Sequence, residues 1–181
     1  MKRLFLLTAI AGVLAFSSAS AQNRKDPAMG GAKLSAGVEF GLPTGDFSNS
    51  HKLGIGGSLV YIAPIADNLK FTANAGYISF SGKEYVITNN ISIKQPSASF
   101  IPVKAGLRYY FIENFYGAAE LGAVFAGKNA SGTAFAYSPG IGIEFPIADK
   151  STIDLGARYE GWSNNGTLSF FGIRAAINFG L

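Results

Sequence analysis

The stretch TIDLGARYEGW, residues 152 to 162, alternates apolar and charged side chains. Its charged residues, Asp154, Arg158 and Glu160, fall in the same set of alternate positions, and apolar residues fill most of the other set. Because successive side chains of a strand point to opposite faces, the pattern predicts a strand with one apolar face and one charged face. A soluble sandwich would turn the charged face to water, whereas a membrane barrel would turn it inward. The rest of the chain decides between them.

The N-terminus has the three-part pattern of a secretory signal peptide. Lys2 and Arg3 precede a mainly apolar run over residues 4–16, and the small residues Ala19-Ser20-Ala21 follow. The run is shorter than the roughly 20 residues that a membrane-spanning helix needs. We therefore expect export and cleavage after residue 21.

The composition of the remaining chain argues against several classes of protein. Without Lys2 and Arg3, 13 basic residues face 11 acidic ones, so no nucleic-acid partner is expected. The absence of cysteine excludes disulfides and thiolate sites. Charged residues make up 14% of the chain, compared with roughly 25% in soluble domains. An exported chain with so few charges and no later spanning helix favours a barrel.

Seven further segments repeat the alternation of the opening stretch, which gives eight predicted strands. Each is close to the roughly 9 to 11 residues that a tilted strand needs to cross a bilayer. The connections after the second, fourth and sixth strands are short and the others longer, as in outer-membrane barrels. The predicted strands are 33–42, 53–63, 69–80, 100–111, 115–125, 134–145, 152–162 and 168–179.

The two faces of these strands differ sharply in charge. One face has no Asp, Glu, Lys or Arg, and the other combines charges with Gly, Ala and Ser. Because Arg or Lys facing lipid at the bilayer midplane costs roughly 2 to 4 kcal/mol, the uncharged face is expected to contact lipid. A soluble sandwich with a large core is the alternative. The charges expected to pair inside the lumen are Lys33, Glu39, Lys70, Lys104, Arg108, Glu120, Glu144, Asp154, Arg158, Glu160 and Arg174.

Trp162 lies near a strand end, and we expect it to join outward Tyr and Phe side chains in an aromatic belt at the membrane interface.

Pro102 and Pro139 lie inside strands that have no free edge in a closed barrel. Because proline lacks an N–H for the ladder, β-bulges are expected there.

The longest connection, between residues 80 and 100, contains a second alternating pattern around an Asn pair. This pattern predicts a hairpin that extends beyond the membrane. We expect the hairpin to contact an extracellular ligand. The predicted contact residues are Tyr85, Ile87, Asn89, Asn90, Ile91 and Ile93.

Candidate catalytic chemistry is confined to the first long connection. His51, the only histidine, follows Asp46, Ser48 and Ser50, so a nucleophile and a base are conceivable there. No sequence context gives these groups the geometry of a triad, and a solvated loop histidine is the preferred interpretation. The GIGG at residues 54–57 lacks the Lys and Ser/Thr of a phosphate loop and is expected to serve close packing. We expect no catalytic residue, metal site or cofactor.

Five stretches, in their order and spacing, resemble the small eight-stranded outer-membrane barrels of the OmpA/OmpX type, also described as porin-family or outer membrane beta-barrel domain proteins. They are GLPTGDFSNSHKLGIGGSLVY (41–61), IPVKAGLRYYF (101–111), YSPGIGIEFPI (137–147), LGARYEGW (155–162) and FFGIRAAINFGL (170–181). The family's closing strand usually ends in an aromatic residue. Here Phe179 is third from the end and Leu181 is last.

The resemblance implies an all-β fold, an eight-stranded antiparallel up-and-down transmembrane β-barrel in the cell outer membrane. Expected partners are outer-membrane lipid and lipopolysaccharide, the barrel-insertion machinery through the C-terminal strand, and a ligand of the second outer loop. We expect a structural or surface-loop binding role with a plugged lumen; a narrow pore for small solutes and a lipid A-modifying enzyme are the alternatives. The expected division is a signal peptide at 1–21, a periplasmic N-terminal segment at 22–32 and an outer-membrane β-barrel at 33–181.

Overall fold

The computed structural model describes residues 31–88, 91–164 and 166–181. The predicted signal peptide and most of the predicted periplasmic segment therefore lie outside the described residues. Asn89 and Asn90 of the predicted hairpin lie outside them as well.

Eight strands form a closed antiparallel barrel in the order β1-β10-β9-β8-β7-β6-β3-β2, and β4 pairs with β5 in a separate two-stranded sheet. The predicted fold class is thus confirmed. The elements are β1 (Lys33–Thr44), α3 (Gly45–Ser50), β2 (His51–Ala66), β3 (Leu69–Gly82), β4 (Glu84–Thr88), β5 (Ile91–Lys94), β6 (Ala98–Tyr110), β7 (Phe115–Ala126), β8 (Thr133–Ala148), β9 (Ser151–Ser163) and β10 (Thr167–Gly180).

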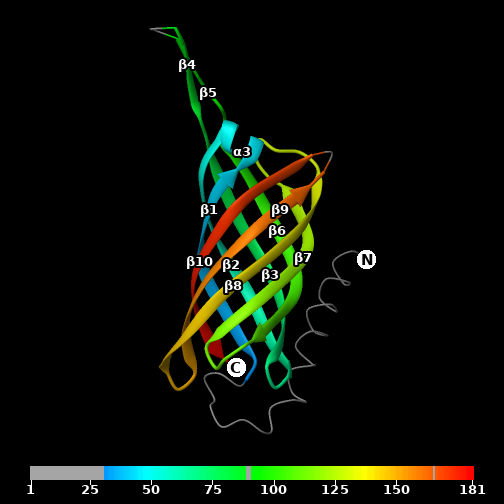
Figure 1. Cartoon of the computed structure of the whole chain (residues 1–181). Helices are drawn as coiled ribbons and strands as arrows, with labels where there is room; N and C mark the ends of the chain where they lie inside the picture. Colours follow the sequence, from blue (N-terminus) through cyan, green and yellow to red (C-terminus); the bar gives the residue numbers. More distant parts are fainter. Residues whose placement is uncertain (1–30, 89–90, 165) are drawn as a thin grey trace, which may run out of the picture.

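The two ends of the barrel differ (Figure 1). The short connections β2–β3, β6–β7 and β8–β9 lie at the end that also holds the C-terminus. The opposite end carries α3 and the longer connections, and the β4–β5 ribbon projects from it. The connections match the predicted alternation except at the last one: β9 ends at Ser163 and β10 begins at Thr167, so this connection has three residues, fewer than the four of β6–β7.

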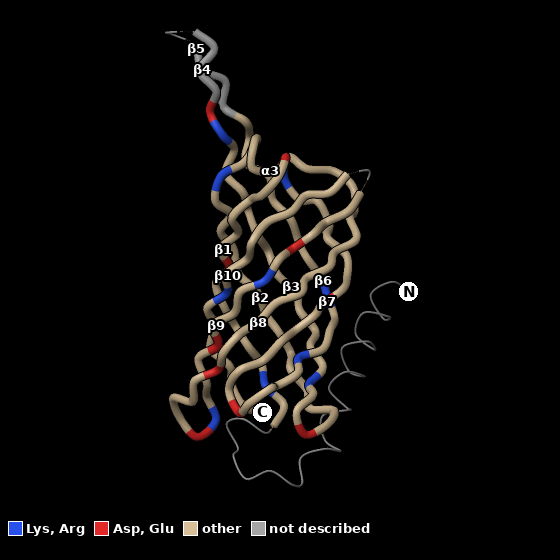
Figure 2. Tube along the Cα trace, in the orientation of Figure 1, with Lys and Arg blue, Asp and Glu red and all other residues tan. Residues whose placement is uncertain are grey.

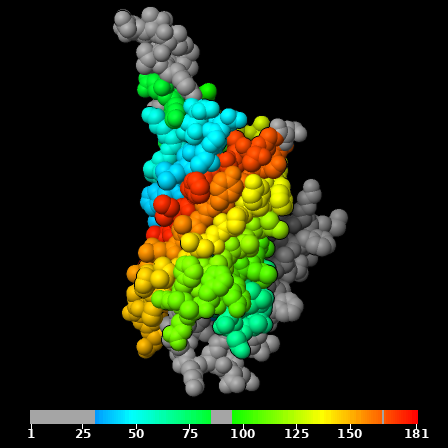
Figure 3. Space-filling view, in the orientation of Figure 1, coloured from blue at the N-terminus to red at the C-terminus, as the bar shows by residue number. Residues whose placement is uncertain are grey.

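The alternation read from the sequence appears in β1 as alternating burial. Lys33 and Glu39 are buried inside the barrel, whereas Leu34 and Val38 are exposed on the outside. The other barrel strands follow the same rule, so exposed Leu, Ile, Val, Phe and Tyr side chains cover the outer wall. Figure 3 shows the tilted strands as adjoining bands of side chains on one face. In Figure 2 the charged positions are few and scattered among the strands and turns.

Glycines allow the interior of the wall to be tightly filled. A Cβ on Gly54 would lie 2.4 Å from Cε1 of Phe80, and a Cβ on Gly56 would lie 2.0 Å from the carbonyl oxygen of Tyr77. Since real Cβ contacts are never this short, these two positions of the GIGG stretch require glycine. This agrees with the close packing expected from the sequence.

The bulges expected at the two prolines are absent. At each proline the ladder to one neighbouring strand skips two positions and then resumes in the same register. On its other side each proline stays paired, Pro102 with Val124 and Pro139 with Ala119. A proline removes only one N–H, so a short gap on one side suffices and no extra residue is inserted. The pairs that flank the gaps are Ala75↔Val103 and Ile78↔Phe100, and Tyr137↔Gly161 and Gly140↔Arg158.

The first long connection contains a short helix that the sequence pattern does not predict. Gly45 begins α3 with a φ of 54°, a value that favours glycine. Phe47, in the middle of α3, is buried against the barrel interior. No helix in the described part of the chain is long and apolar enough to cross a membrane.

The outward orientation of Leu155 gives a test of the two faces. Leu155→Arg should lower the free energy of unfolding in lipid by roughly 2 to 4 kcal/mol, because the cation would face hydrocarbon. Thr167→Arg, at an exposed position where β10 begins among the long connections, should have little effect. Refolding yield and urea unfolding in lipid vesicles measure both. Equal effects of the two variants would contradict the assignment of faces.

Candidate functional site: the barrel interior and its loop-bearing end

The side chains that fill the barrel form two layers of different chemistry. All eleven charged residues predicted for the lumen point inside. They extend from the end with the short turns to beyond the middle of the barrel. Above them, toward α3, the filling becomes aromatic.

One group of ion pairs surrounds two carboxylates near the short-turn end. Glu144 on β8 pairs with Lys33 of β1 at 2.5 Å and with Arg108 of β6 at 2.7 Å. Arg108 also lies 2.8 Å from Asp154 of β9. These four residues come from four strands, so the group ties together opposite sides of the wall.

A second group lies closer to the aromatic layer. Lys104 on β6 pairs with Glu160 of β9, and its Nζ lies 3.0 Å from Glu120 of β7. Arg158 bridges Glu39 at 2.8 Å and Glu160 at 2.6 Å. Because these carboxylates accept from charged donors deep inside the barrel, removal of one partner would leave a buried charge uncompensated.

The last two predicted charges make different contacts. Arg174 donates from Nε to Ser58 Oγ at 2.9 Å and from Nη2 to Ser35 Oγ at 2.9 Å, and its Nε lies 3.4 Å from Glu39. The Lys70 ammonium lies 4.4 Å from the ring centroid of Tyr110, a cation–π distance.

Two tyrosines that were not predicted from the sequence also belong to the network. Tyr110 donates to Glu144 Oε1 at 2.5 Å, and Tyr116 donates to Asp154 Oδ1 at 2.6 Å. The Arg108 guanidinium also lies 3.8 Å from the centroid of the Tyr116 ring. Strand phase was the available signal, since Tyr110 is two residues from Arg108 on the same strand and so shares its face.

An aromatic layer closes the loop-bearing end of the interior. Phe80 lies at its centre, with ring centroids 4.8 Å from Phe47, 5.1 Å from Phe170, 6.2 Å from Phe100 and 6.3 Å from Trp162. Edge-to-face packing of this kind stabilises aromatic clusters. All five rings are buried, so water has little access between them.

The expectation that Trp162 belongs to an outer aromatic belt is wrong. Its side chain is 2% exposed, lies inside the barrel and donates from Nε1 to Glu160 Oε2 at 3.0 Å. The physical reason is the period of the strand: Trp162 occupies the same alternate positions as Asp154 and Arg158. Trp162 therefore connects the aromatic layer to the ion pairs below it.

Above the aromatic layer, the loop-bearing end holds a cavity of about 380 Å³. Phe100, Val124 and Trp162 line it, together with polar residues of the long connections that include Asp46 and Asn164. Its volume and mixed lining are within the range of small-molecule sites. We call it the mouth cavity.

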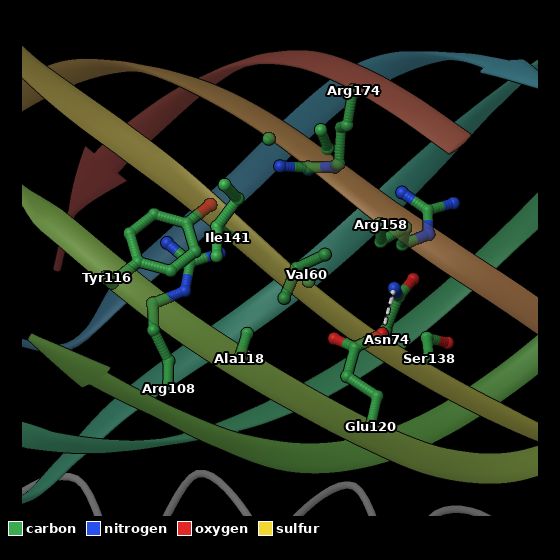
Figure 4. A pocket seen from close by; sticks show the side chains of 13 residues that line it. Val60, Asn74, Arg108, Tyr116, Ala118, Glu120, Ser138, Ile141, Arg158 and Arg174 are labelled. Carbon is green, nitrogen blue, oxygen red and sulfur yellow. Dashed lines mark hydrogen bonds between the residues drawn. The ribbon is translucent and has the colours of Figure 1, made fainter. Parts of the chain in front are cut away.

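A smaller cavity of about 50 Å³ lies within the charged layer. Figure 4 shows Arg108, Arg158 and Arg174, which come from three strands, around this region together with Asn74 and Glu120. We call it the arginine cavity.

The candidate catalytic residues of the first long connection are only partly brought together. Ser50 Oγ lies 2.8 Å from His51 Nδ1, and the Phe47 ring centroid lies 4.9 Å from that of His51. Partial burial lowers the pKa of His51. Within the described residues, no hydrogen bond links Asp46 to His51, and no cluster of three potential metal ligands occurs.

The predicted hairpin is formed by β4 and β5, whose pairs include Tyr85↔Ile93 and Thr88↔Ile91. Ile87 lies in β4. The ribbon projects beyond the barrel at the loop-bearing end (Figure 1). Four of the six predicted contact residues thus lie on its two strands, and the other two, Asn89 and Asn90, fall outside the described residues.

The model of the family described as outer membrane protein beta-barrel domain matches residues 6–179. The chain belongs to this family. The wall of this outer-membrane barrel, apolar outside and charged within, is consistent with membership. No curated protein matches the sequence.

Solved structures of outer-membrane barrels share the fold at low sequence identity. Neisserial surface protein A is 12% identical with a TM-score of 0.58, covering 83% of this chain and 97% of that one. Ail of Yersinia pestis, solved with the heparin analogue sucrose octasulfate, is 15% identical with a TM-score of 0.54, covering 82% and 96%. OprG of Pseudomonas aeruginosa is 10% identical with a TM-score of 0.54, covering 82% and 94%.

Removal of Arg158 tests the charged layer. Arg158→Ala leaves Glu39 and Glu160 with one fewer cationic partner inside the barrel, so the free energy of unfolding should fall by roughly 3 to 5 kcal/mol. Lys52→Ala, which removes an exposed cation at the loop-bearing end, is the matched control and should change it by less than about 0.5 kcal/mol. Urea unfolding in lipid vesicles measures both. An Arg158→Ala barrel as stable as the control would show that the ion pairs do not hold the strands together.

Proposed function

We propose that this outer-membrane barrel neither catalyses a reaction nor conducts ions, and that it acts at its loop-bearing end by binding an extracellular partner. The observation that carries the proposal is the filling of the interior, an ion-pair network below a layer of packed aromatic rings. The interior side chains thus stabilise the barrel, and the loop-bearing end is the part available to bind a partner.

Two physical arguments support a closed lumen. An eight-stranded barrel is just wide enough for its own side chains to fill. Here Lys104 and Arg158 pair with carboxylates of other strands, and Phe80 packs against rings of β6, β9 and β10 above them. The arginine cavity has room for about one or two water molecules, since a water occupies about 30 Å³.

The direction of the barrel in the membrane follows from its connections. Short turns of outer-membrane barrels face the periplasm and longer loops face outward. The β4–β5 ribbon, α3 and the mouth cavity would then face the exterior, and lipid and lipopolysaccharide would surround the apolar wall. The C-terminal strand β10 would be the part that the insertion machinery recognises.

The β4–β5 ribbon is the part best suited to contact a partner. Two strands that leave the barrel as a separate sheet have free edges on both sides. A free strand edge presents unpaired N–H and C=O groups that can add a strand from another protein. The mouth cavity at the base of the long connections offers a second surface on the same end.

A lipid A-modifying activity is the second candidate, because Ser50 and His51 are within hydrogen-bond distance. The expected result is that His51→Ala leaves the lipid A of the host membrane unchanged. Mass spectrometry of lipid A from cells with either form measures this. A lipid A species that depends on both the protein and His51 would establish the enzyme instead.

Recordings in a planar bilayer test whether the lumen conducts. The intact protein should give no steady, ohmic conductance, because both layers block the axis. Arg158→Ala should give small, unstable openings, and Phe80→Ala combined with Trp162→Ala should give larger ones, since two rings leave the aromatic layer. Reproducible channels in the unmutated protein, with ion selectivity altered by Arg158→Ala, would make the lumen a pore.

Protease treatment of intact cells tests the exposure of the ribbon. Trypsin should cut at Lys83 or Lys94, which flank the paired strands. Lys150, in the short β8–β9 turn, is the control site and should be cut only after the outer membrane is opened. Cleavage at Lys150 with Lys83 and Lys94 protected would reverse the proposed direction of the barrel.

A further inference from the structure

The charged layer does not balance. Its eleven residues are six bases and five acids, so the fully ionised interior carries one excess positive charge. A net charge inside a barrel that is surrounded by lipid is costly unless another charge compensates it.

Cationic side chains outnumber carboxylates in the lining of the arginine cavity. Arg108, Arg158 and Arg174 line it from β6, β9 and β10 (Figure 4). Glu120 is the one carboxylate among its lining residues. That carboxylate is already engaged, because Lys104 lies 3.0 Å from Oε2 and Asn74 Nδ2 donates to the same oxygen at 3.0 Å.

Two guanidinium nitrogens beside the cavity have N–H groups to spare. Arg174 Nη1 and Arg108 Nε are buried and have no hydrogen-bond acceptor among the described residues. Both side chains belong to residues that are 6% exposed. Arg174 Nη1 lies 3.9 Å from Asp154 Oδ2, beyond hydrogen-bond distance. Buried donors in proteins nearly always have an acceptor.

We propose that the arginine cavity binds one small monovalent anion, of the size of chloride or bromide. Such an ion would accept from the free guanidinium N–H groups and cancel the excess charge of the layer. The volume of about 50 Å³ admits a halide but not a larger oxyanion such as sulfate together with its hydration shell. Val60 and Ala118 contribute apolar surface to the lining. The site is independent of any partner at the outer end.

Unfolding in different salts tests the proposal first. The full mature barrel is refolded into lipid vesicles in sodium chloride, sodium bromide or sodium gluconate at equal ionic strength. A ligand that binds only the folded state lowers the unfolding equilibrium constant by the factor 1 + [L]/Kd, about elevenfold at ten times Kd. Halide should therefore move the urea midpoint upward relative to gluconate. Equal midpoints in the three salts would overturn the proposal.

A pair of variants at Ala118 separates a bound anion from a general salt effect. Ala118→Asp introduces a fixed carboxylate into the cavity, and Ala118→Asn introduces a side chain of nearly the same size without charge. In gluconate the Asp variant should have the higher urea midpoint, and halide should no longer raise it. A higher midpoint for the Asn variant would mean that the cavity does not favour a negative charge, which contradicts the proposal.

Crystals grown in sodium bromide give a direct measurement. An anomalous difference peak should lie in the cavity within about 3.5 Å of Arg174 Nη1, the range of an N–H contact to a large anion. Ala118→Asp crystals grown in the same way should lack the peak. Density without anomalous signal in the unmutated protein would identify a water molecule and refute anion binding.

Discussion

The pairing of β1 with β10 is the contact on which the rest of the molecule depends. In hydrocarbon every backbone N–H and C=O must be satisfied within the protein, and only closure of the sheet removes the two free edges. The register from Lys33↔Gly180 to Thr44↔Ser169 runs along the whole of β1. Closure defines an inside, and the inside is the only part of the wall where charged side chains can avoid lipid. The ion pairs are therefore possible only because the sheet is closed, and they also link strands on different sides of the barrel.

Much of this architecture could be predicted from the sequence, because strand period and membrane chemistry act on every residue of a strand. A single charged Asp154 or Arg158 fixes the phase of all of β9, which explains why the strands and the inward charges were predicted correctly. Trp162 was misassigned because its position near a strand end outweighed its phase. Tyr110 and Tyr116 were not predicted, because tyrosine occurs on both faces of the wall and so does not by itself indicate the lumen.

Other features depend on the relative stagger of strands, which local patterns do not encode. Lys104 meets Glu160 from a strand three places away around the barrel, and no spacing along the chain indicates this pair. The cavities likewise depend on which glycine faces which side chain. Whether the ladder at Pro102 has a gap or a bulge depends on which of the two costs less free energy. The helix α3 depends on the packing of Phe47 against aromatic rings of later strands.

The pairing of β1 with β10, which we call the seam, also affects the rate of folding. Its partners lie at opposite ends of the barrel sequence, so their meeting requires closure of a loop that contains nearly the whole chain, with the entropy loss and slow rate that long-range contacts bring. Until that step, β1 and β10 remain open edges that can pair with strands of another unfinished barrel. Phe47 follows β1 directly, and its packing with Phe80 and the cluster that includes Phe170 joins the two ends across the top of the seam. The aromatic layer thus favours the closed barrel over an aggregate in which strands pair edge to edge. Only correct closure brings these aromatic side chains together.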